Sequence, residues 1–432
     1  MKEDIDFSLE ACHARIERWQ PRLNAFIARE MLAAGKSSGP LAGVPMAHKD
    51  MFYRAGKFSN CGSKILKGWV ASYTSAALER LDAAGAMQIG TLGMAEFAYN
   101  PTGHNQHWGD CCNAWNPDYI AGGSSSGSGA AVAARLVWGA LGSDTGGSVR
   151  IPAAVNGITG LKTTWGRVSR HGAMPLAHSL DTVGPLARSA EDCGQMFEVI
   201  AGYDERDSIT SREPVCDFRK VAKPSLTIST AWIEKHVEPE VAAAVLAAAK
   251  ELRAAGLNVK EAEAPDFEAL SVQCSTILST EASAQHLPWM RTRPQDYGSA
   301  VRARLDAGYA VPATAYIEAL RLRGPWLDRF CATTLASADA YLLPTMTLRV
   351  PTRAETGPGG ADSACLLPEI TRLTRWVNYL GLPALVLPCG FDSRGLPISM
   401  QIVGRPFAEA TVLAAGHAYQ GRTDWHQRVP TL

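Results

Sequence analysis

The sequence has no excess charge of either sign and no long apolar run. Its 432 residues include 42 Lys and Arg and 42 Asp and Glu, so no net field concentrates nucleic acid or an anionic membrane surface around it. The start, MKEDIDFSLEACHARIERW, carries charges where a secretory signal has its apolar core. No later run approaches the roughly 18 apolar residues of a membrane span. We therefore expect a cytoplasmic protein with no nucleic-acid or membrane partner and a small-molecule substrate.

The ten cysteines form no CxxC pair, and in a chain with no export signal we expect free thiols. Cys111 and Cys112 are adjacent, which is not metal-ligand spacing. His104 and His107 form an HxxH pair without a third ligand candidate nearby, so we expect them in a surface loop. The sequence predicts neither a metal site nor a cofactor.

Helix and strand patterns alternate along the chain, which is 46% apolar and 19% charged and so able to bury a core. Residues 72–90 run from a Ser/Thr start through a helical pattern to Gly85 and a short strand. Residues 239–265 repeat that order, with a proline near the helix start. We expect one large α/β domain over 1–432, with a mixed, mostly parallel central sheet covered by helices on both faces. Residues 205–224 are a candidate connector and 352–364 a surface loop.

The stretch GGSSSGSGAAVAARLVWGALGSDTGGSVRIPAA, residues 122–154, concentrates serine and glycine. A flexible linker does not fit, because the run leads straight into an apolar segment typical of a buried helix. A phosphate loop needs lysine after its last glycine, where this chain has Ser128. A nucleophile elbow centred on Ser125 needs a buried strand before it, but NPDYIA precedes. A catalytic serine site of another kind remains.

GGSS followed by SDTGGSVRIPA resembles the hallmark of the amidase signature family, serine hydrolases of linear amides. Three further blocks resemble the family in the same order. They are LAGVPMAHKD at 41–50, SLDTVGPLARSAED at 179–192 and GLPALVLPCGFDSRGLPISMQIVGRPF at 381–407. The resemblance extends over about residues 22–420, with the core catalytic motifs in 41–192 and the closing block at 381–407.

The resemblance implies a Ser-cisSer-Lys triad. Ser148, the last serine of DTGGS, corresponds to the nucleophile, which forms an acyl-enzyme. Ser124, 24 residues earlier, corresponds to the bridging serine with the cis peptide bond, and Lys49 to the base. The backbone of Thr145, Gly146 and Gly147 is expected to form the oxyanion hole. Arg150 and Asp144 are expected to pair and hold this turn.

Lysine acts as a base only when neutral. Its usual pKa is about 10.4, so the role requires a depression of roughly 3 units, which burial supplies. The apolar LAGVPM before Lys49 is consistent with burial. The neighbouring Asp50 would oppose the shift if its charge faced the amine, so we expect it to point elsewhere.

Substrate choice is expected to depend on residues from about 265 to 378, where arginines are concentrated. Arginines reaching inward would favour a small acid amide, such as a malonamate or a carboxylated urea derivative. Candidate substrate-binding residues lie here and at departures from the family pattern beside the catalytic blocks; they are His48, His178, Ser126, Tyr297 and Arg302.

Other functions remain open at this point. The family includes the glutaminase subunit of a tRNA-dependent amidotransferase, which works with a partner subunit. An aryl amide such as indoleacetamide is a further candidate substrate. A non-catalytic binding module is disfavoured by the intact Lys49, Ser124 and Ser148. For the assembly, base rates favour a homodimer.

Overall fold

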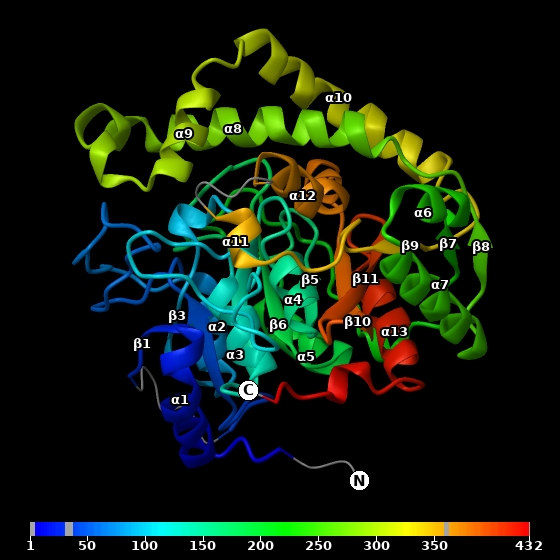
Figure 1. The fold of residues 1–432 in the computed structure, drawn as a ribbon, viewed down its shortest axis with the longest axis horizontal. Coiled ribbons are helices and arrows are strands. Elements are labelled where there is room, and N and C mark those ends of the chain that lie inside the picture. The colour runs from blue at the N-terminus through cyan, green and yellow to red at the C-terminus, as the bar shows by residue number, and fades with distance from the viewer. Residues whose placement is uncertain (1–4, 31–37, 358–362, 432) are drawn as a thin grey trace.

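An eleven-stranded sheet runs through the molecule in the computed structural model, which describes residues 5–30, 38–357 and 363–431 (Figure 1). The strands are β1 Phe26–Ala28, β2 Pro45–Lys49, β3 Met87–Leu92, β4 Gly139–Asp144, β5 Thr159–Lys162, β6 Thr182–Ala187, β7 Leu226–Ile228, β8 Val259–Glu261, β9 Ala340–Pro344, β10 Ala384–Phe391 and β11 Pro397–Gly404. Their spatial order is β1-β3-β2-β4-β6-β5-β10-β11-β9-β7-β8.

The helices of the described chain are α1 Leu9–Leu23, α2 Ala76–Ala83, α3 Ser126–Ala133, α4 Arg150–Asn156, α5 Ala190–Ile200, α6 Thr230–His236, α7 Pro239–Ala254, α8 Phe267–Thr292, α9 Ser299–Gly308, α10 Ala313–Ala332, α11 Arg353–Thr356, α12 Ser363–Tyr379 and α13 Glu409–Gln420. The two expected helix–strand units are confirmed as α2–β3 and α7–β8. The expected surface loop at 352–364 is wrong in part, because α11 lies within it, begun by a capping box at Thr352, and α12 starts near its end. Residues 358–362 of that expectation lie outside the described residues.

The sheet is mixed, as expected, but the prediction that it is mostly parallel is wrong. Parallel pairing joins β3 to β2, β2 to β4, β9 to β7 and β7 to β8. The other six neighbouring pairs are antiparallel. The closing block explains part of the difference. Its two long strands, β10 and β11, form a hairpin in the middle of the sheet instead of being separated by a crossover helix.

Helices cover both faces of the sheet. On β10, Leu385 and Leu387 lie against Gly416 of α13, whereas Val386 belongs to a buried cluster with Ala130 of α3 and Ala153 of α4. Successive residues of a strand point to opposite faces, so α13 lies on one face and α3 and α4 on the other. These observations confirm a single large α/β domain whose sheet is buried on both sides.

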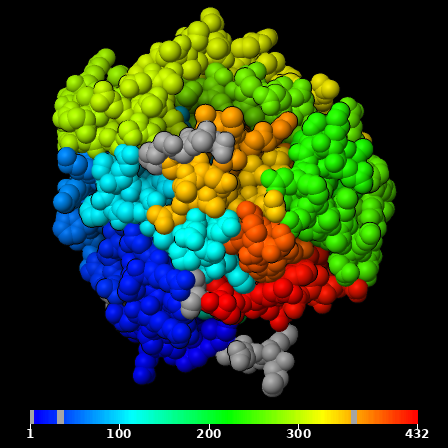
Figure 2. Space-filling view, viewed as in Figure 1, coloured from blue at the N-terminus to red at the C-terminus, as the bar shows by residue number. Residues whose placement is uncertain are grey.

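Helices α8, α9 and α10 form a separate cover over one end of this core (Figure 1). Helix α8 packs against α9, α10 and α12, and α12 in turn contacts α4. In the space-filling view the same segment runs as a continuous arch beside the residues of α12 (Figure 2). Within the described residues, no helix is long and apolar enough to cross a membrane.

Candidate active site

The parallel strands β2 and β4 bring the catalytic motifs together. Lys49 is the last residue of β2 and Asp144 the last residue of β4, and the two strands are neighbours. The carboxyl ends of parallel neighbours lie at the same edge of the sheet, so Lys49 faces the turn that carries Ser148 between β4 and α4. Ser124 lies just before α3, and its peptide bond with Gly123 is cis, as the family resemblance implies.

Lys49 is completely buried and hydrogen-bonded to two hydroxyl groups. Its Nζ lies 2.7 Å from Ser124 Oγ and 2.8 Å from Ser143 Oγ. Burial lowers the pKa of Lys49 to about 7, although Asp144 and Asp181 act in the opposite direction. The structure thus brings Lys49 and Ser124 together and provides an environment in which the amine is readily neutral.

Asp50 points away from this lysine, as expected. Its carboxylate accepts hydrogen bonds from the backbone N–H groups of Asn60 and Gly62, and burial raises the pKa of Asp50 to about 7. The adjacent acid therefore does not hold Lys49 in its charged form.

The turn after β4 is held by a buried ion pair. Arg150 Nε lies 3.0 Å from Asp144 Oδ2 and Arg150 Nη2 lies 3.0 Å from Oδ1, which confirms the expected pairing. The same carboxylate accepts the N–H groups of Gly147 at 2.8 Å and Val149 at 3.1 Å. Ser125 N donates to Ser148 O at 3.2 Å, which joins this turn to the loop of Ser124.

The predicted oxyanion-hole residues do not all keep a free donor. The N–H of Gly147 is engaged by Asp144, so it is not available to a ligand. Within the described chain, the N–H groups of Thr145 and Gly146 have no protein acceptor. Thr145 is fixed by its side chain, whose Oγ1 donates to Asp181 at 2.6 Å.

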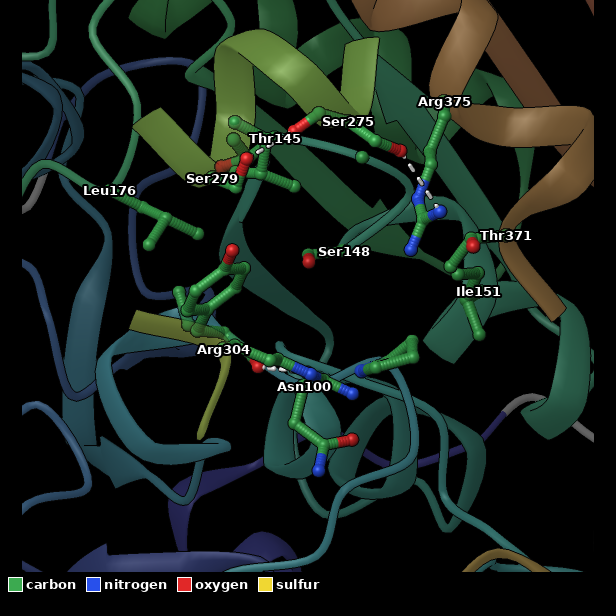
Figure 3. A pocket seen from close by; sticks show the side chains of 15 residues that line it. Asn100, Thr145, Ser148, Ile151, Leu176, Ser275, Ser279, Arg304, Thr371 and Arg375 are labelled. Atoms are coloured by element: carbon green, nitrogen blue, oxygen red, sulfur yellow. Dashed lines mark hydrogen bonds between the residues drawn. The ribbon is translucent and has the colours of Figure 1, made fainter. Parts of the chain in front are cut away.

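Ser148 lines a cavity of about 250 Å³, and in the close view it lies between the other labelled lining residues (Figure 3). Loop residues 98–101, the turn at Thr145 and Gly146, and helices α8, α9 and α12 form its wall. Two partly buried arginines, Arg304 of α9 and Arg375 of α12, are its charged lining groups, and no described lining residue is an acid. The remaining lining residues are Ile151, Leu176, Ser275, Leu278, Ser279 and Thr371.

The structure places the five predicted substrate-binding residues outside this cavity. His48 is buried beside Gln88, Ser126 lies buried in α3, and Tyr297 is bonded to His286 at 3.0 Å. His178 lines a second cavity of about 230 Å³, which Ser143 and Met51 also line. Arg302 is 47% exposed and pairs with Asp306.

Sequence reasoning missed Ser143 and Arg375, and among the concentrated arginines it selected Arg302 as a binding residue instead of Arg304. Ser143 precedes Asp144 directly in the quoted stretch, and its contact with Lys49 required the pairing of β4 with β2. The two arginines were within the segment expected to select substrate, but the helix faces that carry them were not known. The histidines of the HxxH pair do lie in a loop, partly buried, where His104 contacts Asp110 and His107 contacts Glu96.

Comparison with known proteins identifies the family. The amidase family model matches residues 8–413. The chain is therefore a member of the amidase (amidase-signature) family, and its class is that of amide-hydrolysing enzymes.

Individual relatives differ in what they do. The A subunit of the glutamyl-tRNA(Gln) amidotransferase of Methylococcus capsulatus (strain ATCC 33009 / NCIMB 11132 / Bath) is 38% identical over 96% of this chain and 93% of its own. A chain from a vestigial protein complex, described as revealing the evolutionary origins of an s-triazine catabolic enzyme, is 33% identical, with a TM-score of 0.87 over 95% of this chain and 94% of its own. A 6-aminohexanoate cyclic dimer hydrolase with bound substrate is 28% identical, with a TM-score of 0.88 over 99% and 96%.

Proposed function

We propose that this protein hydrolyses the amide bond of a small substrate that carries a carboxylate, releasing ammonia or an amine. Ser148 is the nucleophile, Ser124 relays its proton and Lys49 is the base. The observation that carries the proposal is the cavity around Ser148, which combines this serine with Arg304 and Arg375 and has no acid among its described lining residues.

We infer the following reaction. Neutral Lys49 takes the proton of Ser124, which takes that of Ser148 as its Oγ attacks the amide carbon. The N–H groups of Thr145 and Gly146 stabilise the oxyanion of the tetrahedral intermediate. The proton then returns along the same path to the leaving nitrogen, the C–N bond breaks, and water hydrolyses the acyl-enzyme.

The substrate class follows from the size and charge of the cavity. At about 250 Å³ it is below the roughly 300–1,000 Å³ of pockets that hold drug-sized ligands, so it suits a small molecule. An arginine binds a carboxylate through two parallel hydrogen bonds, and the low dielectric of a partly buried site strengthens that pairing. An aryl amide without a carboxylate, such as indoleacetamide, leaves both guanidinium groups unpaired.

A glutaminase subunit of a tRNA-dependent amidotransferase is the second candidate, favoured by the names of many relatives. Glutamine has an α-carboxylate that an arginine can bind, but it also carries an α-ammonium group, which needs acceptors and repels a guanidinium. The described lining has two arginines and no acid, so it suits glutamine less well than an anionic amide. The vestigial complex among the similar structures supports testing for a partner protein in either case.

The test is ammonia or amine release at about pH 8 from malonamate, ureido acids, glutamine, indoleacetamide and anilides, with Ser148→Ala as the control. We expect the anionic amides, malonamate and the ureido acids, to be cleaved with a higher kcat/KM than zwitterionic glutamine and the uncharged amides, and the variant to be inactive. Preference for glutamine, or activity that appears only on co-expression with a partner that co-purifies in fixed stoichiometry, would replace this proposal by the glutaminase function.

A further inference from the structure

Arg304 and Arg375 are two cationic side chains in the cavity that have no anionic partner among the described residues. Arg304 donates from Nη1 to the backbone oxygen of Tyr99, and Arg375 donates from Nη1 to Ser275 Oγ at 3.2 Å. Both acceptors are neutral. Among the described residues neither guanidinium forms an ion pair, whereas Arg372, three residues before Arg375 on α12, pairs with a glutamate.

Two such cations in one small cavity are costly without an anion. Each guanidinium keeps its charge and has five N–H donors, of which its bond to the protein uses one. Burial lowers the pKa of both arginines, and the charge of Arg375 adds to the lowering at Arg304, so the two groups are close enough to repel each other. A single carboxylate leaves the cavity with one uncompensated positive charge, and two carboxylates neutralise it.

The two arginines approach Ser148 from different sides. In the close view Arg375 lies with Ser275 and Thr371 on one side of the serine, and Arg304 lies with Asn100 on the other (Figure 3). They come from different helices, α12 and α9. A substrate whose carbonyl is at Ser148 therefore has one arginine on each side of the reacting carbon.

The geometry points to a substrate with two carboxylates, one on the acyl part and one on the leaving amine, each bound by one of these arginines. The chemical class is an N-carboxyacyl amino acid, and Arg375 is its second specificity-determining residue. This inference rests on the proposed function. Ser148 Oγ bonds to the acyl carbon, the C–N bond breaks and the nitrogen takes a proton, so an amino acid leaves. Water then cleaves the ester to give a dicarboxylic acid and free Ser148.

Steady-state kinetics on three matched amides test it. N-succinylglycine has both carboxylates, succinamate has only the one on the acyl part, and N-acetylglycine has only the one on the amine. We expect kcat/KM for N-succinylglycine to exceed that of both others by about a hundredfold, because each charge-assisted pair contributes. Arg375→Gln lowers kcat/KM for N-succinylglycine by about a hundredfold and changes it by less than threefold for one of the monocarboxylates. Arg304→Gln is expected to change kcat/KM by less than threefold for the other monocarboxylate. Arg372→Gln, which removes a neighbouring arginine of α12, is the matched control.

A binding measurement makes the inference testable without turnover. In the Ser148→Ala background, calorimetry is expected to show pimelate, whose carboxylates are as many atoms apart as those of N-succinylglycine, binding at least tenfold more tightly than hexanoate, with the ratio lost on Arg375→Gln. Thermal unfolding of each variant shows whether it is folded.

The inference is overturned if succinamate or N-acetylglycine is as good a substrate as N-succinylglycine, or if Arg375→Gln leaves the ratio of pimelate to hexanoate affinity within twofold of its value without that substitution. If a preference for one carboxylate persists and depends on Arg304 alone, the proposed function stands and only the second site fails. If neither arginine affects any carboxylate preference, or activity survives Ser148→Ala, the proposed function fails as well.

Discussion

At the residue scale, the burial of Lys49 predicts the pH dependence of the reaction. The pKa of this lysine is lowered to about 7. In the proposed mechanism the neutral amine is the active form. We therefore expect kcat/KM to rise about tenfold per pH unit below that pKa and to level off above it. The measurement is kcat/KM for the best substrate from about pH 5.5 to 9.

Asp50 titrates in the same range, because burial raises its pKa to about 7. The Asp50→Asn variant separates the two groups: the rise with pH is kept if Lys49 causes it. A profile that is flat over this range in the wild-type enzyme contradicts the assignment of Lys49 as a base that must lose its proton.

The sequence indicated part of this residue-scale chemistry and missed another part. The block LAGVPMAHKD predicted a buried Lys49, and the DTGGS turn predicted the pairing of Asp144 with Arg150; the structure confirms both. Arg302 was expected to bind substrate, but it is exposed and paired with Asp306, whereas Arg304 lines the cavity. Two residues along a helix turn the side chain to a different face, and composition does not reveal which face is inward.

At the element scale, the turn after β4 tolerates no side chain at Gly147. This glycine has φ +133, and a Cβ there would lie 2.5 Å from Thr374 Oγ1 of α12. Thr374 Oγ1 also donates to Gly146 O at 2.7 Å, so a displaced helix would move the proposed oxyanion donors. We expect Gly147→Ala to lower kcat by about a hundredfold, since a shift of about 1 Å has an effect of that size.

Gly324→Ala is the matched control for that substitution. Gly324 lies within α10, and a Cβ there meets nothing within 4 Å. Pro325 follows Gly324 and disfavours helical backbone for any preceding residue with a Cβ, so the control is expected to keep kcat without raising the free energy of unfolding. Denaturant unfolding and kcat are measured for both variants. Equal kcat values would show that the turn accommodates a methyl group.

Element-scale prediction from the sequence was good for local units and poor for pairing. Helix α7 begins at Pro239 and ends just before Gly256, the pattern from which it was predicted. The direction of a strand relative to its neighbours depends on contacts far apart in the chain. The closing block joins the sheet through the pairing of β10 with β5, and no local sequence pattern predicts that pairing.

At the scale of the whole molecule, the balance of charge predicts how salt affects the enzyme. With 42 basic and 42 acidic residues there is no net field to steer an anionic substrate from a distance. The arginines act within a partly buried cavity, where salt screens them weakly. We expect kcat/KM for a carboxylate-bearing amide to fall by less than about threefold between roughly 0.01 and 0.15 M ionic strength. A neutral amide serves as the control, and a fall of tenfold or more would reveal long-range steering.

The cover of α8, α9 and α10, together with α12, carries the charged residues of the cavity on different elements from the proposed catalytic residues. The proposed catalytic residues lie at the end of β2, in the turn after β4 and before α3, whereas the two charged groups that line the cavity lie on α9 and α12. If the proposed roles hold, mutation in these helices changes which amide is accepted without altering the reacting groups. Enzymes for unlike amides can thus descend from one ancestor by single steps that each preserve a working nucleophile, and directed evolution of this chain is best confined to the same helices.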